Sequence, residues 1–417
     1  MSQELAAELA RCNRCGFCQA TCPIFRATGH EAGVARGRLA ILQALEEGEL
    51  AWSPALEEPL FTCLLCGACT TNCFPAIPTA DLLVAARSEY LASVRRSRVH
   101  RLLFERLLPY PARLRRAARL VALGQRSGLA TVARALGLLR IFGRDFPRAS
   151  EIVERFPARF LRERVEPGAL PGEGQGPRIA YFVGCGIEVM TPQAGEASLA
   201  VLRRLAREVV VLENCCCGLP AWSYGDLEAA RRLASRNLEL IAEGFDLVVT
   251  DCSSCAAFLK KYPRLFPGDD PLRERAEAMA GKVRDWVEAV AEAELPLPEA
   301  GSFTVTYHDP CHASRGQGLV VEPRRLISSL PGADYRELPE ADWCCGGAGS
   351  YSRSHYDLAR KVLERKMRNV ARTGARVVAT SCPACMVHLA YGARLLGEDV
   401  RVCHLSELVA GGREPCQ

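Results

Sequence analysis

Two runs of four closely spaced cysteines near the start of the chain constrain its fold more than any other feature. The first run reads Cys-x2-Cys-x2-Cys-x3-Cys-Pro, and the second repeats the cysteine spacing after an interval of 40 residues. The eight residues are Cys12, Cys15, Cys18, Cys22, Cys63, Cys66, Cys69 and Cys73. Three thiolates on one tight loop can bind three iron corners of a cubane, while a fourth beyond a helical turn reaches a neighbouring cluster. The spacing therefore predicts two [4Fe–4S] clusters.

The interlocked spacing also predicts which cysteines share a cluster. One cluster is assigned Cys12, Cys15, Cys18 and Cys73, and the other Cys63, Cys66, Cys69 and Cys22. In the second run Phe74 separates Cys73 from Pro75, which should alter the exit of the loop and not the ligation. Zinc knuckles or disulfides fit less well, because zinc sites pair two Cys-x2-Cys units and seldom use two runs of four.

The composition indicates an intracellular redox protein. There are 21 cysteines in 417 residues, but no secretory signal is visible at the start, so a disulfide scaffold is not expected. Arg or Gly interrupts every apolar stretch before it reaches the roughly 18 residues of a membrane span. We therefore expect a cytoplasmic protein of two or three domains that does not cross the membrane.

One segment contains most of the positive charge. Between Arg87 and Arg164 the chain has 19 Arg, no Lys and 6 Asp or Glu. Apolar residues recur in it at helical spacing, at Leu102, Leu103, Leu107, Leu114, Leu120, Val121, Leu123, Leu129, Val132, Leu136 and Leu139. Such helices either dock onto an anionic membrane surface or acidic partner, or pack on the rest of the protein with Arg exposed. No motif that reads nucleic acid is present, so a nucleic-acid partner is not expected.

An internal repeat begins near residue 178. Each copy has a strand-like segment followed by a cysteine, then a Cys-Cys-Gly, then a second strand-like segment followed by Cys-x2-Cys. Three landmarks recur at offsets of 126, 128 and 130 residues, from Cys185 to Cys311, Cys217 to Cys345 and Cys252 to Cys382. The steady offset indicates duplication of one α/β unit.

Five thiols are expected to converge in each copy. They are Cys185, Cys216, Cys217, Cys252 and Cys255, and then Cys311, Cys344, Cys345, Cys382 and Cys385. Each follows a strand and precedes a helical pattern, which places it at the carboxyl edge of an α/β sheet, where ligands bind. Five exceeds the four ligands of zinc or an ordinary cubane, so either an unusual cluster is bound or one cysteine is spare. Zinc would use the same positions.

Several cysteines and histidines lie outside this ligand set. Cys215, Cys403 and Cys416 have no counterpart in the repeat and are taken as non-ligands. His308 and His312 flank Cys311, and His404 follows Cys403. Each could replace a ligand or donate a proton near a cluster, but we expect hydrogen-bonded structural histidines.

The arrangement resembles the iron–sulfur subunit of glycolate oxidase. It equally resembles the related subunits of D-lactate dehydrogenase, anaerobic glycerol-3-phosphate dehydrogenase and heterodisulfide reductase. Beyond the cysteines, the resemblance includes Gly37-Arg38-Leu39, the stretch from Cys344 to Tyr351, Asp357 to Lys361, Lys366-Met367 and His388-Leu389-Ala390. It covers nearly the whole chain and is more specific for the superfamily than for the substrate.

The resemblance implies an oxidoreductase subunit that passes electrons and has no catalytic residues of its own. A separate FAD-containing subunit would oxidise glycolate or D-lactate, and this chain would deliver electrons towards quinone or a membrane acceptor. No G-x-G-x-x-G follows a strand-like segment to suggest a dinucleotide site here. Peripheral contact with the inner face of the membrane would accompany this role.

Two alternatives stay open. In heterodisulfide reductase the same repeats hold non-cubane [4Fe–4S] clusters that cleave a disulfide, and every one of those ligand positions matches a cysteine here. The iron–sulfur subunit of anaerobic glycerol-3-phosphate dehydrogenase is the other alternative. The cofactors expected are therefore two [4Fe–4S] clusters near the start, and one or two further clusters or zinc in the repeats.

The predicted fold is a multidomain α+β protein. Residues 1–85 form an α-helical ferredoxin-like domain with two clusters, since Arg38 to Glu47 between the cysteine runs has a helical pattern. Residues 86–175 form the Arg-rich helical connector. The Cys-Cys-Gly repeats occupy 176–267 and 301–417, with a linker at 268–300.

Overall fold

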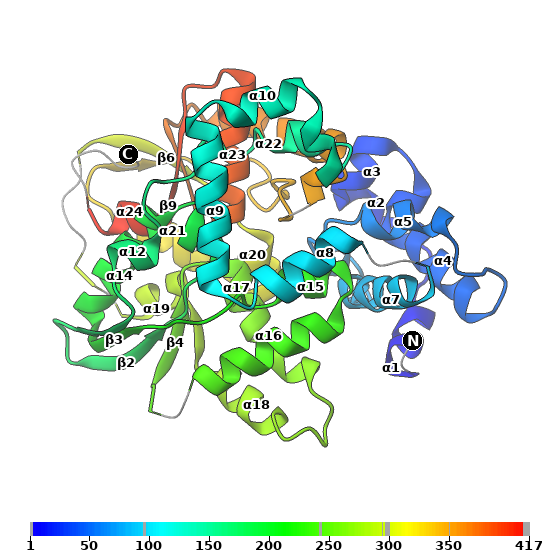
Figure 1. Cartoon of the computed structure of the whole chain (residues 1–417), viewed down its shortest axis with the longest axis horizontal. Coiled ribbons are helices and arrows are strands. Elements are labelled where there is room, and N and C mark those ends of the chain that lie inside the picture. Colours follow the sequence, from blue (N-terminus) through cyan, green and yellow to red (C-terminus); the bar gives the residue numbers. More distant parts are fainter. Residues whose placement is uncertain are drawn as a thin grey trace.

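The computed structural model describes residues 3–94, 97–241, 244–293, 295–296, 301–349 and 351–411. Helices predominate and two separate sheets lie between residues 168 and 404, so the predicted mixture of helix and sheet is confirmed. Helices α1 to α7 gather at one side of the molecule, and the sheets lie at the other (Figure 1). The predicted domain boundaries stay predictions.

The part of the chain with the two cysteine runs is helical. Its elements are α1 Gln3–Ala10, α2 Phe17–Thr21, α3 Pro23–Thr28, η1 Glu31–Gly33, α4 Ala35–Glu46, η2 Pro54–Leu56, α5 Glu57–Phe61, α6 Ala68–Thr71 and α7 Thr79–Ser93. Apolar side chains from α4, α5 and α7, among them Leu39, Leu60 and Leu83, form its core. The short helices α2 and α6 follow the cysteine loops and pack against each other.

The Arg-rich connector is helical between residues 98 and 164, but its end departs from the prediction, because residues 168–171 form a strand of the first sheet. It contains α8 Arg98–Leu102, η3 Leu103–Leu107, α9 Pro111–Arg126, α10 Leu129–Ala135, η4 Leu138–Phe142, α11 Phe146–Ala149 and α12 Leu161–Arg164. Phe104 and Leu108 are buried in the core of the first repeat, and α9 buries Ala118 and Ala122. In Figure 1 helix α9 runs across the front of the molecule. Among the described residues, no helix has the length and apolar character that a membrane crossing needs.

The first repeat has a five-stranded sheet in the order β1-β3-β2-β4-β5. The strands are β1 Gly168–Pro171, β2 Gly176–Tyr181, β3 Ala206–Val211, β4 Leu247–Thr250 and β5 Val283–Asp285, and only β1 is antiparallel to its neighbour. The helices and turns between them are α13 Cys185–Val189, α14 Pro192–Leu205, α15 Leu219–Tyr224, α16 Leu227–Leu240, α17 Ser253–Leu259, η5 Tyr262–Leu265, α18 Arg273–Lys282 and α19 Trp286–Glu292.

The second repeat has the same parallel arrangement, in the order β7-β6-β8-β9. Its strands are β6 Phe303–Tyr307, β7 Ala333–Tyr335, β8 Val377–Thr380 and β9 Arg401–His404. Its helices are α20 Cys311–Gln317, α21 Val321–Ser328, η6 Tyr351–Arg353, α22 Tyr356–Thr373, α23 Pro383–Leu396 and α24 Leu405–Val409. Strands β6 to β9 therefore correspond in order to β2, β3, β4 and β5.

The segment 268–300, expected to be a linker, contributes to the first sheet. Strand β5 pairs with β4, and Asp285 begins α19 with a capping box in which its side chain accepts from Val287 N at 3.0 Å. A three-residue strand between two helices is too short to show the alternation that indicates a strand. The α/β unit is therefore longer than the cysteine landmarks suggested.

Candidate metal centres

Four thiols line a single cavity in the helical part of the chain. Cys63, Cys66 and Cys69 come from the second run, and Cys22 comes from the end of the first. Burial raises the pKa of Cys22 to about 11 and that of Cys69 to about 12. Without a bound metal, both thiols are therefore protonated at neutral pH. Metal coordination deprotonates a thiol outright. A cavity with four converging sulfur donors and few other polar groups fits the expected cubane, while the assignment of these four cysteines as its ligands stays a prediction.

The other four cysteines of the runs are less enclosed. Cys15 is exposed, whereas Cys12, Cys18 and Cys73 are half-buried. Hydrogen bonds join the segments that contain them, from Thr21 Oγ1 to the Ala68 carbonyl at 3.2 Å and from Asn72 Nδ2 to the Phe17 carbonyl at 2.7 Å. The two runs therefore lie against each other, as an exchange of the fourth cysteine between clusters requires.

The two cysteine loops share an unusual backbone conformation. Arg14 and Leu65 each precede the second cysteine of their run and have φ of 52° and 53°. Side chains other than glycine rarely adopt this left-handed region, which costs of order 1–3 kcal/mol. The same strain at the same position in both runs indicates one loop geometry selected twice.

Buried arginines lie beside the cavity lined by Cys22, Cys63, Cys66 and Cys69, which we call the enclosed thiol pocket. Arg87 donates to the carbonyl oxygens of Cys63 and Leu60, both at 2.8 Å. Burial lowers the pKa of Arg87 to about 10, which still leaves it charged at neutral pH. Arg38 lines the pocket and donates to Thr62 Oγ1 at 3.0 Å. Fixed positive charge next to bound iron is one means of setting its reduction potential.

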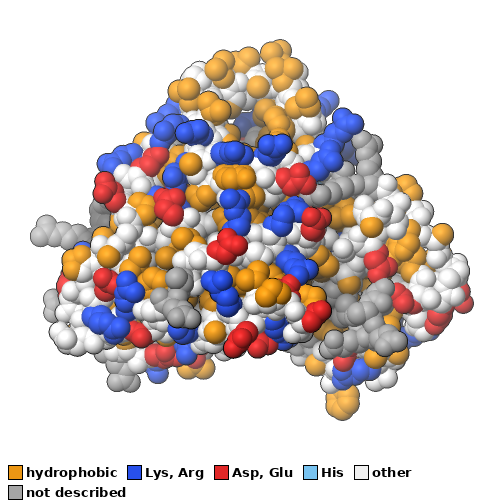
Figure 2. Space-filling view, turned by 60° about the horizontal axis from the view of Figure 1, so that its bottom comes forward, with side chains coloured by type: hydrophobic (Ala, Val, Ile, Leu, Met, Phe, Trp, Pro, Cys, Tyr) orange, Lys and Arg blue, Asp and Glu red, His pale blue; other side chains and the backbone are white. Residues whose placement is uncertain are grey.

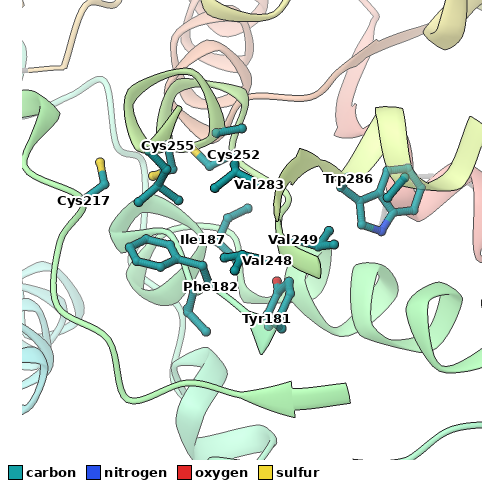
Figure 3. Packing of buried hydrophobic residues seen from close by; sticks show 14 of the residues in the cluster. Tyr181, Phe182, Ile187, Cys217, Val248, Val249, Cys252, Cys255, Val283 and Trp286 are labelled. Atoms are coloured by element: carbon teal, nitrogen blue, oxygen red, sulfur yellow. The ribbon is translucent and has the colours of Figure 1, made fainter. Parts of the chain in front are cut away.

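In the first repeat the five thiols form a chain at the carboxyl ends of the strands, as expected. Cys185 and Cys216 are 4.0 Å apart between sulfurs, Cys216 lies against Cys217, Cys217 against Cys255, and Cys255 against Cys252. Thiol donors from Cys216 and Cys255 lower the pKa of Cys217 to about 5. Figure 3 shows Cys217, Cys252 and Cys255 above the apolar strand residues, beside the ring of Phe182.

The second repeat brings the corresponding five thiols together in the same order. Cys311 lies against Cys344, Cys344 against Cys345, and Cys385 against Cys382. The sulfurs of Cys345 and Cys385 are 3.3 Å apart. Backbone N–H groups point at the sulfurs too, from Gly346 to Cys344 and from Gly347 to Cys345, both at 3.4 Å. Such hydrogen bonds stabilise thiolate sulfur and bound clusters.

A glycine follows each Cys-Cys pair for a steric reason. Gly218 and Gly346 have φ of 99° and 84°, and a Cβ at Gly346 would lie 2.7 Å from the carbonyl oxygen of Ala359. Only glycine adopts this conformation without strain. The glycine therefore lets the backbone turn between the paired thiols and the next helix.

The cysteines form separate thiol sets, namely those of the two runs and the five of each repeat. Thiols of different sets meet at two junctions. Between the repeats, Cys252 lies against Cys382, and Ser253 N donates to the Ser381 carbonyl at 3.0 Å. Between the helical part and the second repeat, the thiol of Cys66 lies against that of Cys344, which with burial raises the pKa of Cys66 well above its usual value. The second junction joins residues that are far apart in the sequence.

Several residues help to position these thiols, and this role was not predicted from the sequence. Arg315 donates to the Cys66 carbonyl at 3.3 Å and to Asp342 at 2.8 Å, across the Cys66–Cys344 junction. Its position one helical turn after Cys311 on α20 was the available signal. Asn237 donates to the Cys216 carbonyl at 3.1 Å, and Lys366, 129 residues later, donates to the Ala341 carbonyl at 3.0 Å. Both hold the loop before or within a Cys-Cys pair.

Of the three cysteines without a counterpart in the repeat, the structure describes Cys215 and Cys403. The sulfur of Cys215 points towards α16 and donates to Asn237 Oδ1 at 3.2 Å. Cys403 is buried in β9. Cys416 lies outside the described residues.

Two of the three histidines behave as expected. His404 bonds to the Asp251 carbonyl and Ser406, and His312 Nδ1 lies 2.9 Å from Ser254 Oγ. For His308 the expectation is wrong, because neither ring nitrogen has a hydrogen-bond partner among the described residues.

Three family models match the sequence in the regions just described. Residues 8–77 match a 4Fe-4S dicluster domain, and residues 179–260 and 305–390 both match a cysteine-rich domain. Residues 95–152 match the linker region of the glycolate oxidase iron-sulfur subunit. The first two descriptions agree with the placement of the cysteines and support several iron–sulfur clusters.

Curated relatives extend the similarity to almost the whole chain. The chain is 32% identical over 416 residues to the probable glycolate oxidase iron-sulfur subunit of Bacillus subtilis, covering 96% of this chain and 93% of the relative. It is 29% identical to lactate utilization protein A 2 of Bacillus mycoides, over 56% of this chain and 98% of the relative. It is 33% identical to one subunit of the fumarate reductase (CoM/CoB) of Methanothermobacter marburgensis, over 57% of this chain and 47% of that longer protein. The chain belongs to the family of glycolate oxidase iron–sulfur subunits.

Proposed function

We propose that this chain is the electron-transfer subunit of a flavin-dependent 2-hydroxy acid dehydrogenase whose substrate is glycolate or D-lactate. One observation is central to the proposal: the enclosed thiol pocket and the two repeats meet thiol to thiol, at Cys66–Cys344 and Cys382–Cys252. Iron–sulfur clusters in these thiols would supply one-electron transfer, which matches a flavin that takes up two electrons at once. The similarity to glycolate oxidase and lactate utilization proteins supports the substrate class.

The ligands in this proposal are the eighteen cysteines expected from the sequence, eight in the two runs and five in each repeat. The thiol sets are ordered from the exposed Cys15, through the pocket of Cys66, to the second repeat at Cys344 and then to the first repeat at Cys252. We propose that electrons follow this order. The chain itself holds the thiols in contact, encloses all but the first set, and places Arg87 and Arg315 beside them.

The exposed end of this order is the expected contact with the flavin subunit. Phe17 and Phe74, which lie next to cysteines of the less enclosed set, are 62% and 94% exposed. Exposed aromatic side chains are frequent at protein interfaces. An interface at this end would bring the flavin subunit close to Cys15, where the thiols are least enclosed.

The substrate is tested with the complex purified anaerobically together with its flavin partner. Glycolate, D-lactate or glycerol 3-phosphate is added, and cluster reduction is recorded by EPR. Reduction by glycolate or D-lactate that requires the flavin subunit is expected. Reduction by glycerol 3-phosphate alone would replace the substrate assignment. Reduction by none of them would reject the proposed function.

Disulfide reduction is the second candidate. Both Cys-x2-Cys pairs are intact, all five thiols converge in each repeat, and one relative belongs to a fumarate reductase named for CoM and CoB. A new paramagnetic species on addition of a thiol or disulfide, with no response to a hydroxy acid, would favour this candidate.

The connector is the proposed attachment to an anionic membrane surface, close to a quinone or other membrane acceptor, on the cytoplasmic side. On α9 the side chains of Arg113, Arg116, Leu120 and Leu123 lie at helical spacing opposite the buried Ala118 and Ala122. Leu120 is 72% exposed, and α10 and η4 add Leu129, Val132, Leu136, Leu138 and Ile141 as further exposed apolar residues. In Figure 2 hydrophobic side chains gather at the upper end of the face, with Lys and Arg side chains below them.

Replacing Arg116, Leu120 and Leu123 together with glutamine is expected to weaken binding to anionic vesicles tenfold or more. A basic residue near an anionic surface contributes about 1 kcal/mol, and each leucine buried there contributes about 1.5–3 kcal/mol. Vesicle sedimentation at low and high salt measures the effect, because salt screens the arginine contribution.

The matched control is Val321→Gln, since Val321 is 68% exposed on α21, which is not part of the connector segment. Unchanged vesicle binding by the triple variant would reject the membrane assignment. If binding to the flavin subunit weakened instead, the connector would be a protein interface.

A further inference from the structure

His308 lies among the thiols of the second repeat. It follows β6 directly, three residues before Cys311, and its side chain is fully buried. One ring nitrogen and the sulfurs of Cys345 and Cys385 lie within 4.8 Å of one another. Two thiolates on one tetrahedral metal ion, at bond lengths near 2.3 Å, lie about 3.8 Å apart. The three side chains are therefore close enough to bind one metal ion.

Within the described part of the chain, no well-formed hydrogen bond explains the burial of the imidazole. Among the described residues, neither Nδ1 nor Nε2 of His308 makes a hydrogen bond. An unsatisfied buried polar atom costs about 1–3 kcal/mol. The backbone on either side is fixed, since His308 N donates to the Ala379 carbonyl at 3.0 Å and Thr380 Oγ1 donates to the His308 carbonyl at 3.1 Å. The ring is held beside the thiols with its nitrogens free to bind.

A second buried histidine near the same thiols differs from His308 in its hydrogen bonding. His388 on α23 is also buried, but its Nδ1 is hydrogen-bonded to the Cys345 carbonyl at 2.7 Å. That bond joins the ring to the backbone of the Cys-Cys loop and accounts for its polar atom. In the part of the chain that the structure describes, no such bond accounts for His308.

The first repeat has no counterpart of this histidine. The offset of 126 residues that relates Cys185 to Cys311 places Phe182 at the position of His308, and the offset of 130 places Phe258 at that of His388. Figure 3 shows the Phe182 ring beside Cys217, Cys252 and Cys255. The same fold thus has aromatic rings beside one thiol set where it has imidazoles beside the other.

We propose that His308 supplies a nitrogen ligand to the metal group held by Cys345 and Cys385, so that the second repeat binds through sulfur and nitrogen while the first binds through sulfur alone. This rests on the proposed function only in that the repeat thiols hold a metal group. A neutral imidazole brings no negative charge, and where it takes the position that one of the five thiolates holds in the first repeat it raises the potential of an iron–sulfur centre. The two repeats would then differ in potential although their cysteines match.

The test compares His308→Phe with His388→Phe in the anaerobically purified complex, each copying the residue of the first repeat. Metal analysis comes first. If the repeat holds iron, pulsed EPR for nitrogen couplings and Mössbauer spectra are recorded before and after reduction with dithionite. If it holds zinc, X-ray absorption at the zinc edge reports the nitrogen ligand.

The expected result is a bound nitrogen in the unmodified protein and in His388→Phe, but not in His308→Phe. For an iron centre, the potential of the second-repeat signal should also fall in His308→Phe. Unchanged signals from the eight-cysteine region would show that this variant folds. A spectrum that shows no nitrogen ligand, or one that does not depend on His308, would overturn the inference. Dithionite needs no hydroxy acid, so failure of the substrate assignment would not affect this result.

Discussion

Replacing Cys66 with serine is expected to stop electron delivery beyond the flavin while the flavin is still reduced by substrate. The sulfur of Cys66 lines the enclosed pocket and lies against Cys344, so it belongs both to a predicted cluster and to the junction with the second repeat. Changes next to a metal ligand typically cost 10–100-fold, and loss of a ligand at a junction should cost at least about 100-fold. Rapid mixing with substrate would follow flavin bleaching and acceptor reduction separately, and EPR would count the clusters.

The matched control is Cys215→Ser. Cys215 is buried beside Cys216, but its sulfur donates to Asn237 Oδ1, which a serine hydroxyl can also do. This variant should keep every cluster signal and the full rate. Loss of flavin reduction in Cys66→Ser would contradict the division of labour between the two subunits. A full acceptor rate in that variant would contradict the proposed order of the thiol sets.

The sequence predicted where the thiols gather, because the residues that decide this lie close together along the chain. The cysteine runs, the strand before each repeat cysteine and the glycine after each Cys-Cys pair all lie within a few residues of one another. A strand that ends in cysteine and is followed by a helix can place the thiol only at the carboxyl edge of a parallel sheet. The structure places the ten repeat thiols at that edge.

What the sequence could not predict depends on contacts between distant segments. Cys66 and Cys344 meet because the helical part of the chain packs on the second repeat, where Tyr351 Oη donates to the Thr62 carbonyl at 3.0 Å. No periodicity indicates such a contact. Likewise, helical spacing showed that α9 has an apolar face, but not whether another element covers it. The structure leaves Leu120 and Leu123 exposed.

Replacing Arg162 with methionine is expected to lower the free energy of unfolding of the first repeat by about 3–5 kcal/mol, the usual effect of removing one partner of a buried ion pair. Arg162 on α12 is buried with Glu188, and Nη1 and Oε2 are 3.2 Å apart. Its side chain also donates to the Leu212 carbonyl at 2.8 Å and to Asn214 Oδ1 at 2.9 Å. Burial raises the pKa of Glu188, which also pairs with the half-buried Arg115 at 3.4 Å.

The Arg162→Met substitution should also disturb the thiols of the first repeat, because Arg162 hydrogen-bonds the loop that precedes Cys216. Asn214 Oδ1 also accepts from Val183 N at 3.0 Å, two residues before Cys185, so one guanidinium connects both strand ends of this thiol set.

Urea unfolding followed by circular dichroism measures the stability, and iron content measures retention of the centre. The control is Arg155→Met at an exposed position, expected to change stability by less than about 0.5 kcal/mol. Replacing Glu188 with methionine as well should recover part of the loss, since it removes a buried carboxylate that would otherwise keep Arg115 as its only ion-pair partner. If the free energy of unfolding of Arg162→Met equalled that of the control, the connector would not stabilise the first repeat. The sheet alone would then determine the geometry of these thiols.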